Sequence, residues 1–519
     1  MQISEGHHLS MLGLCLVLAL AGVSAAKDWY VSPTGTPTGD GTQANPLDIF
    51  TALSAKSPAQ PGDTIYLMGG TYEGKIVTTT TREGQQRTRR TPFALAVSGA
   101  PGKPVRIMPV PGQSVHLNGT AALTSSYAEY IGLEIGDLKW DATQQTHQND
   151  TALNVTAGTR TKVINCNIFG GSMGTGLWSG ATDLEIYGCL VHDFGTVSPG
   201  GEGRGHGHAF YTQNERGTKV IAHNIAYRGC GWNLHVYTQA GRIVGFDIIE
   251  NIMYIAGAYK PGQTMDNYLV FGYTPADRIR MIGNVGYAAT DVEKWRPNMR
   301  FSYLKPIRNG TGEIRDNYLM GAFYGLSLGD CEKVEVSGNT IWSTGILVEI
   351  NSAPTGSSLR TRDPKPDLAN FKLDNNIYID NGQPKPFHYG NSEKANPDNQ
   401  VSFAEWQALG LDKNSRMIPG RDGKPTGTKV FVFPNKYQKG RANVGIFNWD
   451  NLASIEVDLA GVLAPGQKYA IYNCLDISQT VTAAKPVATG TYAGGKVALP
   501  MKRAEISPNF EAFLVLPVE

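Results

Sequence analysis

The sequence carries few charges for its length and has almost no net charge. Only 18% of its 519 residues are Asp, Glu, Lys or Arg, and the formal net charge is +1. A chain this close to neutral is not a globally basic nucleic-acid binder, so we expect no nucleic acid among its partners. The sequence also lacks a Gly-rich phosphate loop and a serine nucleophile elbow, so neither enzyme signature is indicated.

Long apolar runs are confined to the N-terminus. Residues 11–22 read MLGLCLVLALAG, and small residues follow at 23–26. This pattern predicts a secretory signal peptide over residues 1–26, although no Lys or Arg precedes it; an N-terminal membrane anchor is the alternative. No later run is long and apolar enough to span a bilayer. We therefore expect a secreted or periplasmic protein without stable membrane insertion.

Cysteine is scarce once the leader is removed. Five cysteines remain, namely Cys166, Cys189, Cys230, Cys331 and Cys474. Because their number is odd and their spacings are wide, neither a disulfide framework nor a zinc site is indicated. Cys166 and Cys189 are close enough in sequence to lie on neighbouring coils of the repeat described next. They form either one disulfide or two buried free thiols.

A repeat is the most informative feature that is present. Short apolar runs are broken by turn residues, and the chain has 61 Gly and 29 Pro, which is typical of an all-β protein. One pattern recurs, with an apolar residue three positions before a marker and, in most copies, another one position after it. The markers are Asn167, Cys189, Asn224, Asn251, Asn284, Asn317, Asn339 and Asn376.

The shortest marker spacing, 22 residues, suits one coil of a parallel β-helix, and larger spacings add longer loops. Stacked coils would bring the asparagines together as a buried amide ladder. We therefore predict a right-handed parallel β-helix over residues 27–382. A connector with a short helix should follow at 383–428, because Ser402 and Glu405 form a capping box. Residues 429–519 alternate strands and turns, which predicts a small antiparallel β-sandwich that either packs on the helix or binds carbohydrate weakly.

The N-terminal segment resembles a known superfamily. Residues 28–46 read DWYVSPTGTPTGDGTQANP, and they are followed by LDIFTAL at 47–53 and PGDTIYLMGGTY at 61–72. Together these segments are similar to the start of pectate-lyase-like parallel β-helices. The resemblance implies an N-terminal helix that caps the open end of the coil stack. It also implies a polysaccharide-active protein, although the superfamily includes lyases, hydrolases, transferases and non-catalytic adhesins.

Three insertions, at 195–208, 256–267 and 288–305, follow the same turn and should wall one part of the outer surface. Strand alternation places unusual polar and aromatic side chains outward beside them. We predict as catalytic residues His208, Tyr211, His235, Tyr237 and Lys260. We predict as substrate-binding residues Arg204, His206, Gln213, Asp266, Lys294, Arg296 and Arg300.

Two chemistries compete for this patch. In β-elimination on a uronate polymer, a histidine would be the base, a tyrosine the acid, and a Lys or Arg the carboxylate clamp. Hydrolysis or glycosyl transfer would instead use two carboxyls. The candidate carboxyls are Asp193, Glu202, Asp247, Asp266, Asp330 and Glu349. A non-catalytic glycan-binding adhesin is the third alternative. We expect a polysaccharide partner and a monomer, and calcium is a candidate cofactor.

Overall fold

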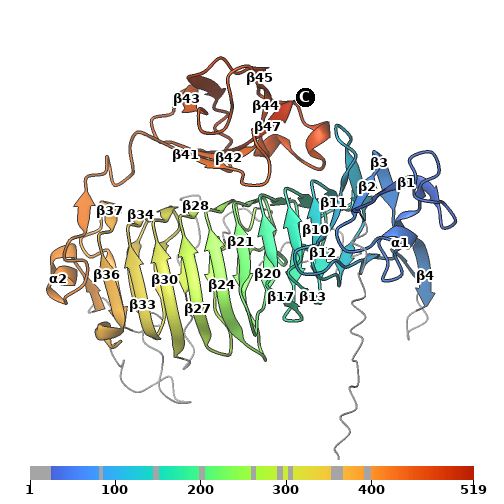
Figure 1. Ribbon diagram of the computed structural model, residues 1–519. Helices are drawn as coiled ribbons and strands as arrows, with labels where there is room; N and C mark the ends of the chain where they lie inside the picture. Colours follow the sequence, from blue (N-terminus) through green and yellow to red (C-terminus); the bar gives the residue numbers. More distant parts are fainter. Residues whose placement is uncertain are drawn as a thin grey trace, which may run out of the picture.

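The computed structural model describes residues 25–80, 86–143, 151–197, 205–258, 265–288, 296–301, 308–351, 366–390 and 399–518. The main body is a stack of coils built from three long sheets (Figure 1). Within each sheet the strands pair in parallel, except that the final pair of sheet 3 is antiparallel. This is the predicted right-handed parallel β-helix.

From β2 to β38, each coil contributes one strand to each sheet. Sheet 1 contains β1 (Asp28–Thr36), β2 (Thr64–Leu67), β7 (Val105–Pro109), β10 (Ala128–Ile131), β14 (Lys162–Ile164), β18 (Glu185–Tyr187), β21 (Lys219–Ala222), β24 (Ile243–Ile249), β27 (Ala276–Ile282), β30 (Asn309–Arg315), β33 (Cys331–Ser337) and β36 (Phe371–Asp374). Sheet 2 contains β3 (Gly70–Glu73), β8 (Val115–Asn118), β11 (Glu134–Gly136), β15 (Asn167–Phe169), β19 (Leu190–His192), β22 (Ile225–Tyr227), β25 (Ile252–Tyr254), β28 (Val285–Tyr287), β31 (Tyr318–Met320), β34 (Thr340–Trp342), β37 (Ile377–Ile379) and β40 (Arg416–Ile418). Sheet 3 contains β6 (Phe93–Leu95), β9 (Ala121–Leu123), β12 (Thr151–Val155), β16 (Met173–Leu177), β20 (His208–Thr212), β23 (Trp232–Val236), β26 (Tyr268–Val270), β29 (Pro297–Phe301), β32 (Tyr324–Leu328), β35 (Ile346–Asn351), β38 (Phe387–Gly390) and β39 (Gln400–Val401).

Short elements complete the stack. Two small sheets pair β4 (Ile76–Thr80) with β5 (Gln86–Arg90) and β13 (Gly158–Thr159) with β17 (Ala181–Thr182). At the N-terminal end lies the helix α1 (Ile49–Ala52), which Asp48 caps and which packs into the main core. This helix lies within the apolar segment that the superfamily resemblance marked.

The asparagine ladder runs through the buried corner between sheets 1 and 2. Asn284 illustrates one rung, because its Oδ1 accepts hydrogen bonds from the N and Nδ2 of Asn251, both at 3.0 Å. Its Nδ2 donates to Ile248 O at 2.8 Å and to Asn317 Oδ1 at 3.0 Å. The same pattern links Asn224 through to Asn376. The predicted ladder is therefore confirmed over these coils.

The predicted register was wrong by one residue in an earlier coil. Asn167 pairs with Leu190, so the residue that lies at the ladder position in its coil is Cys166. Asn167 instead points out of the stack, where its Nδ2 donates to Gln479 O at 2.7 Å. Cys166 and Cys189 are buried free thiols, which decides between the two alternatives left by the sequence.

The β-helix continues beyond residue 382, where the sequence predicted a connector. Strands β38, β39 and β40 belong to the two main sheets 3 and 2, and the helix α2 (Phe403–Ala408) lies between β39 and β40. Ser402 and Glu405 form the predicted capping box. The buried Trp406 stacks on Phe387 with ring centroids 5.1 Å apart. This segment therefore closes the C-terminal end of the core.

A small β-domain packs on the outer face of sheet 2 (Figure 1). Its five-stranded antiparallel sheet has the order β41 (Thr428–Pro434), β42 (Ala442–Asn448), β47 (Phe510–Val518), β44 (Lys468–Asn473) and β45 (Ala488–Thr491). A two-stranded sheet joins β43 (Ser454–Asp458) to β46 (Lys496–Pro500). Phe447 and Phe510 share a buried cluster with Tyr254 and Tyr287 of the coils. The contact supports a packing role for this domain.

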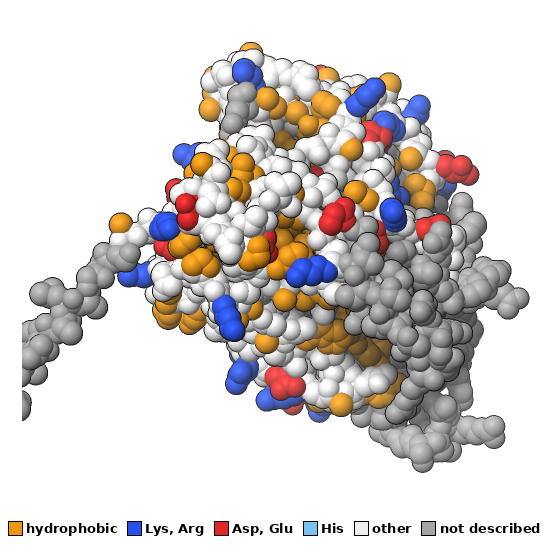
Figure 2. Space-filling model, turned by 90° about the vertical axis from the view of Figure 1, so that its right-hand side faces the viewer, with side chains coloured by type: hydrophobic (Ala, Val, Ile, Leu, Met, Phe, Trp, Pro, Cys, Tyr) orange, Lys and Arg blue, Asp and Glu red, His pale blue; other side chains and the backbone are white. Residues whose placement is uncertain are grey.

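Basic and acidic side chains are interspersed on the face shown in Figure 2, and apolar patches lie between them. This mixture agrees with the nearly neutral net charge. Within the described ranges, no helix is long and apolar enough to cross a bilayer.

Candidate functional site

The candidate site lies on the outer face of sheet 3. Parallel pairing stacks one outward position from coil to coil, and most members of this column are polar or aromatic. In order along the stack they are Gly176, Tyr211, His235, Leu269, Arg300, Ser327, Glu349 and His388. Adjacent members are about 4.8 Å apart along the stack, since this is the separation of paired strands.

The first part of this column belongs to an aromatic cluster, defined here as His208, Tyr211, Trp232, His235, Tyr237 and Phe271. Nδ1 of His235 lies 3.4 Å from Nε2 of His208, and their ring centroids are 4.6 Å apart. The Tyr211 ring lies 5.2 Å from His208 and 5.6 Å from His235. The sequence therefore predicted correctly that these three side chains meet on one face.

Tyr237 and Trp232 enclose the imidazole of His235. The ring centroids lie 4.8 Å and 5.1 Å from that of His235, and both rings stack on it. His235 is buried, whereas His208 and Tyr211 are half-buried. Burial raises the pKa of the Tyr211 hydroxyl, and the nearby Tyr237 adds to the rise, while a hydrogen bond with Gln213 opposes it. His208 and Tyr211 are thus the more exposed of the three residues, while Nδ1 of His208 and Nε2 of His235 are themselves buried.

The other predicted residues are distributed around this cluster. Gln213 is a hydrogen-bond partner of Tyr211, and the guanidinium of Arg296 lies 5.7 Å above the Trp232 ring. His206 is exposed, and its backbone pairs with Thr196 at the base of the insertion, beside the cluster rather than within it. Three further predicted residues lie outside the described residues, namely Arg204, Lys260 and Lys294.

Arg300 lies in a strand, although the sequence predicted it in a loop. The segment 288–305 contains the strand β29, and Arg300 occupies the outward column of that strand. Pro297 and Arg300 itself interrupt the apolar pattern of this strand, so it resembles a loop in the sequence. Part of the segment predicted as one insertion is therefore the strand β29.

Further along the column lies a charged cluster, defined here as Asp266, Arg300, Ser327, Glu349 and His388. All five residues are buried. Arg300 Nε lies 3.2 Å from Asp266 Oδ2, and the hydroxyl of Ser327 donates to Glu349 Oε1 at 2.5 Å. His388 Nδ1 lies 4.0 Å from the other carboxylate oxygen, Glu349 Oε2. Two carboxyls and one guanidinium therefore share a buried site.

Both carboxyls of the charged cluster favour the protonated state more than usual. Burial raises the pKa of Asp266, although Arg300 and Arg296 oppose the rise. Burial also raises the pKa of Glu349, and the Asp266 carboxylate adds to that rise against Ser327 and Arg300. Glu349 Oε2 is buried and has no hydrogen-bond partner among the described residues. A buried carboxylate oxygen without a hydrogen bond destabilises the folded state, and groups of this kind are often found at functional sites.

The remaining candidate carboxyls lie elsewhere. Burial would raise the pKa of Asp193, but hydrogen bonds from His192 and Arg228 outweigh it and hold the pKa at about 2. Arg228 in turn donates to Leu475 O and Ile477 O of the small β-domain. Asp247 pairs with Arg280 on the outside of sheet 1, and Asp330 is in the turn before β33. Glu202 lies outside the described residues.

A second asparagine ladder, which the sequence did not predict, lies on the same coils as the site. Asn233 Nδ2 donates to Asn267 Oδ1 at 2.9 Å, and Asn267 Nδ2 donates to Asn298 Oδ1 at 3.0 Å. All three amides are fully buried and lie two residues before an outward column position. The ladder fixes the coils that present His235, Leu269 and Arg300.

Other members of the site were also not predicted. Trp232 and Phe271 complete the aromatic cluster, while Ser327 and His388 complete the charged cluster. Trp232 lies in the motif WNLHVYTQ, three residues before His235, so the sequence did contain a signal for it. No group of three or more His, Cys, Asp or Glu side chains in the described ranges is placed to hold a metal ion, and the calcium expectation stays untested.

Comparisons with known proteins give distant similarities. No protein-family model matches the sequence. A 92-residue segment, 17% of the chain, is 38% identical to pectate lyase L of Thermoclostridium stercorarium, and it spans only 7% of that longer protein. Among solved structures, pectate lyase Pel9A aligns with a TM-score of 0.41 at 13% identity, over 68% of this chain and 80% of that one.

Two further solved structures are similar at the same level. A rhamnogalacturonan lyase aligns with a TM-score of 0.39 at 17% identity, over 68% of this chain and 87% of its own. The lacto-N-biosidase GH136 from Eubacterium ramulus aligns with a TM-score of 0.39 at 12% identity, over 77% and 68% of the two chains. The chain's own three long sheets identify its fold as a parallel β-helix.

Proposed function

We propose that the protein is a secreted carbohydrate-active enzyme that cleaves an acidic polysaccharide on the outer face of sheet 3. The observation that carries the proposal is the aromatic cluster, in which two imidazoles and a phenol lie in contact on one face. Aromatic rings and a few convergent polar groups are what a sugar-binding surface needs. Residues 1–26 act as a signal peptide in this proposal.

The proposed reaction is β-elimination at a uronate residue. His208 takes the C5 proton, the C5–H electron pair forms the C4–C5 double bond, and the C4–O bond breaks. Tyr211 gives its proton to the leaving oxygen. His235 is a positioning residue in this proposal, because its Nδ1 lies 3.4 Å from His208 Nε2, and a hydrogen bond donated by that Nε2 would leave Nδ1 of His208 as the base. Arg296 is a cation beside the cluster and would neutralise the uronate carboxylate.

The test is incubation of the purified protein with a panel of pectic, alginate and glycosaminoglycan polymers, read at about 235 nm and by reducing ends. Elimination predicts an absorbing product with wild type, and a loss of about 10²-fold or more in rate for both His208→Ala and Tyr211→Phe. The matched controls are His223→Asn and Tyr437→Phe, which lie outside sheet 3. An unaltered rate in Tyr211→Phe would remove that residue from the mechanism.

Glycoside hydrolysis is a second candidate, favoured by the charged cluster. Glu349 and Asp266, which share a buried site with Arg300, would supply the acid and the second carboxylate that glycosidases use. This candidate predicts new reducing ends without absorbance at about 235 nm. The activity would then be lost in Glu349→Gln and kept in Tyr211→Phe. Binding without any product would indicate the third alternative, a glycan-binding protein.

A further inference from the structure

A cleft separates the last coils of the β-helix from the small β-domain, on a different sheet from the aromatic cluster. Its floor is formed by the outward residues of β31, β34, β37 and β40, and its roof by β41. The cleft has a volume of about 340 Å³. Binding sites for small ligands usually have about 300–1,000 Å³ and often lie between domains.

The cleft exists because the small β-domain covers only part of sheet 2. One outward column runs through Ile252, Val285, Tyr318, Thr340 and Ile377. The first two members are fully buried in the interface cluster with Phe447 and Phe510. The last three line the cleft and are only half-buried. The two domains therefore leave an unfilled space where the column continues.

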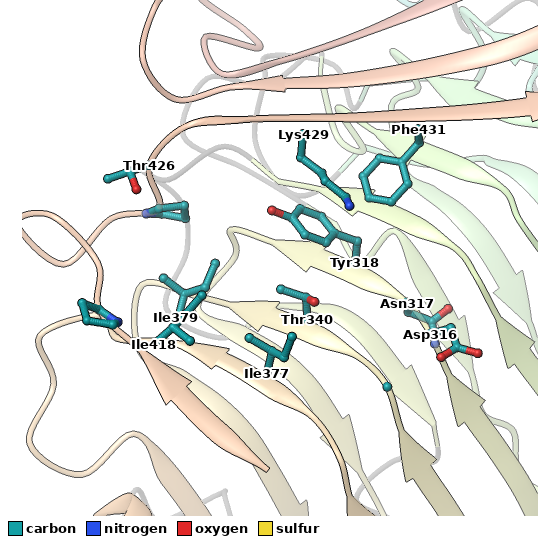
Figure 3. A pocket seen from close by; sticks show the side chains of 13 residues that line it. Asp316, Asn317, Tyr318, Thr340, Ile377, Ile379, Ile418, Thr426, Lys429 and Phe431 are labelled. Atoms are coloured by element: carbon teal, nitrogen blue, oxygen red, sulfur yellow. The ribbon is translucent and has the colours of Figure 1, made fainter. Parts of the chain in front are cut away.

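The lining of the cleft combines aromatic rings with polar groups. The rings of Tyr318 and Phe431 lie 5.1 Å apart, and Lys429 reaches down beside them (Figure 3). The Lys429 amine is 5.4 Å from the Phe431 ring centre. Figure 3 also shows the hydroxyls of Thr340 and Thr426 around the same space. These are groups that stack on the apolar face of a sugar ring and bind its hydroxyls.

The charges favour an acidic ligand. Lys429 is exposed and forms no ion pair with any described side chain. The acidic residue at the edge of the cleft, Asp316, is exposed and pairs with Arg315 at 3.4 Å, a guanidinium that Glu313 also contacts at 3.3 Å. Beside the aromatic rings of the cleft, the charge that pairs with no carboxylate of the described residues is the ammonium of Lys429.

We propose that this cleft is a second saccharide site, which binds one or two sugar units of an acidic glycan away from the cleaving face. This inference takes one element from the proposed function, namely that the glycan is acidic. A site of this kind would hold the polymer on the protein while the aromatic cluster acts on another part of it. It would raise the affinity for long chains without touching the reacting bond.

The experiment uses the full chain with the cleaving face silenced by His208→Ala and Tyr211→Phe. Tetrasaccharides of polygalacturonate and of alginate are titrated by calorimetry, with cellotetraose as the neutral comparison. We expect binding of an acidic tetrasaccharide that Lys429→Glu weakens by about tenfold or more. Phe431→Leu should weaken it too, and because Phe431 also packs against the domain interface, its melting temperature is measured alongside. The matched control is Lys496→Glu, which changes an exposed lysine of the same domain.

The outcomes separate this inference from the proposed function. Binding that depends on Lys429 in a protein that cleaves no polymer would support the cleft and refute the cleaving enzyme. Cleavage by wild type, with tetrasaccharide binding that Lys429→Glu leaves unchanged, would overturn the cleft and leave the enzyme. The absence of Lys429-dependent binding to either acidic tetrasaccharide would also overturn the cleft.

Discussion

The ion pair between Arg300 and Asp266 gives the sharpest test of the charged cluster. The pair is 3.2 Å long, and its side chains are only 9% and 1% exposed. Replacing one partner of such a pair leaves a buried charge without its counter-ion, which costs about 3–5 kcal/mol. We therefore expect Arg300→Met to lower the free energy of unfolding by about that amount at pH 7. Arg315→Met, in a pair that is 44% exposed, should cost no more than about 1 kcal/mol.

The effect of Arg300→Met should depend on pH. Burial already raises the pKa of Asp266, and loss of the guanidinium raises it further. When the pKa of a carboxyl is higher in the folded protein than in the unfolded chain, the folded state is most stable at a pH below the unfolded-state pKa. This stability is lost as the pH rises through the folded-state pKa. The penalty should therefore be largest at pH 7 and should shrink toward pH 4.

The assay is urea unfolding followed by tryptophan fluorescence, for Arg300→Met alone and combined with Asp266→Asn. The second substitution removes the uncompensated charge, so the double variant should recover most of the lost stability. If Arg300→Met cost no more than Arg315→Met, or if Asp266→Asn gave no recovery, the buried pair would not stabilise the folded state as its burial predicts.

Three further predictions concern the asparagine ladder between sheets 1 and 2, the contact between the small β-domain and sheet 2, and the aromatic cluster. Asn284→Ala leaves several buried hydrogen-bonding groups without partners, so urea unfolding should show a loss of about 3 kcal/mol or more, against less than about 1 kcal/mol for the exposed Asn414→Ala. A small loss would mean that the ladder contributes little. Phe447→Ala removes a fully buried ring from the domain interface and should lower the free energy of unfolding by about 3–5 kcal/mol. Proteolysis in a urea series should then release the small β-domain at a lower urea concentration than in wild type. Unchanged release would contradict the packing role. His235→Ala should reduce cleavage and shift its pH profile relative to wild type, whereas a purely structural His235 would lower the melting temperature and leave the profile in place.

The sequence predicted the coils because their buried positions repeat. The ladder asparagines recur at nearly constant offsets from inward apolar residues, and a repeat of this kind survives loops of different length. The register at Asn167 was predicted wrongly because the neighbouring Cys166 occupies the ladder position there. Since the repeat accepts either Asn or Cys at this position, the sequence alone does not distinguish two registers that differ by one residue.

The candidate site was predictable only where neighbouring coils carried similar residues. His208, Tyr211 and His235 lie in two adjacent strands with matching alternation, so their meeting on one face followed from the register. Glu349 and Arg300 lie on different coils separated by loops. Their interactions with Asp266 depend on the lengths and rotamers of the side chains, which the inward and outward alternation along a strand does not specify. The strand β29 was hidden because Pro297 and Arg300 break its apolar pattern.

The central claim is that an acidic glycan binds across the outer face of sheet 3. A crystal structure of the His208→Ala, Tyr211→Phe variant, soaked with an acidic tetrasaccharide from a polymer that the wild type cleaves, tests it most directly. We predict sugar density over positions 208 and 211 and over Tyr237, with a carboxylate facing Arg296. Density confined to other surfaces, with this face empty, would contradict the claim.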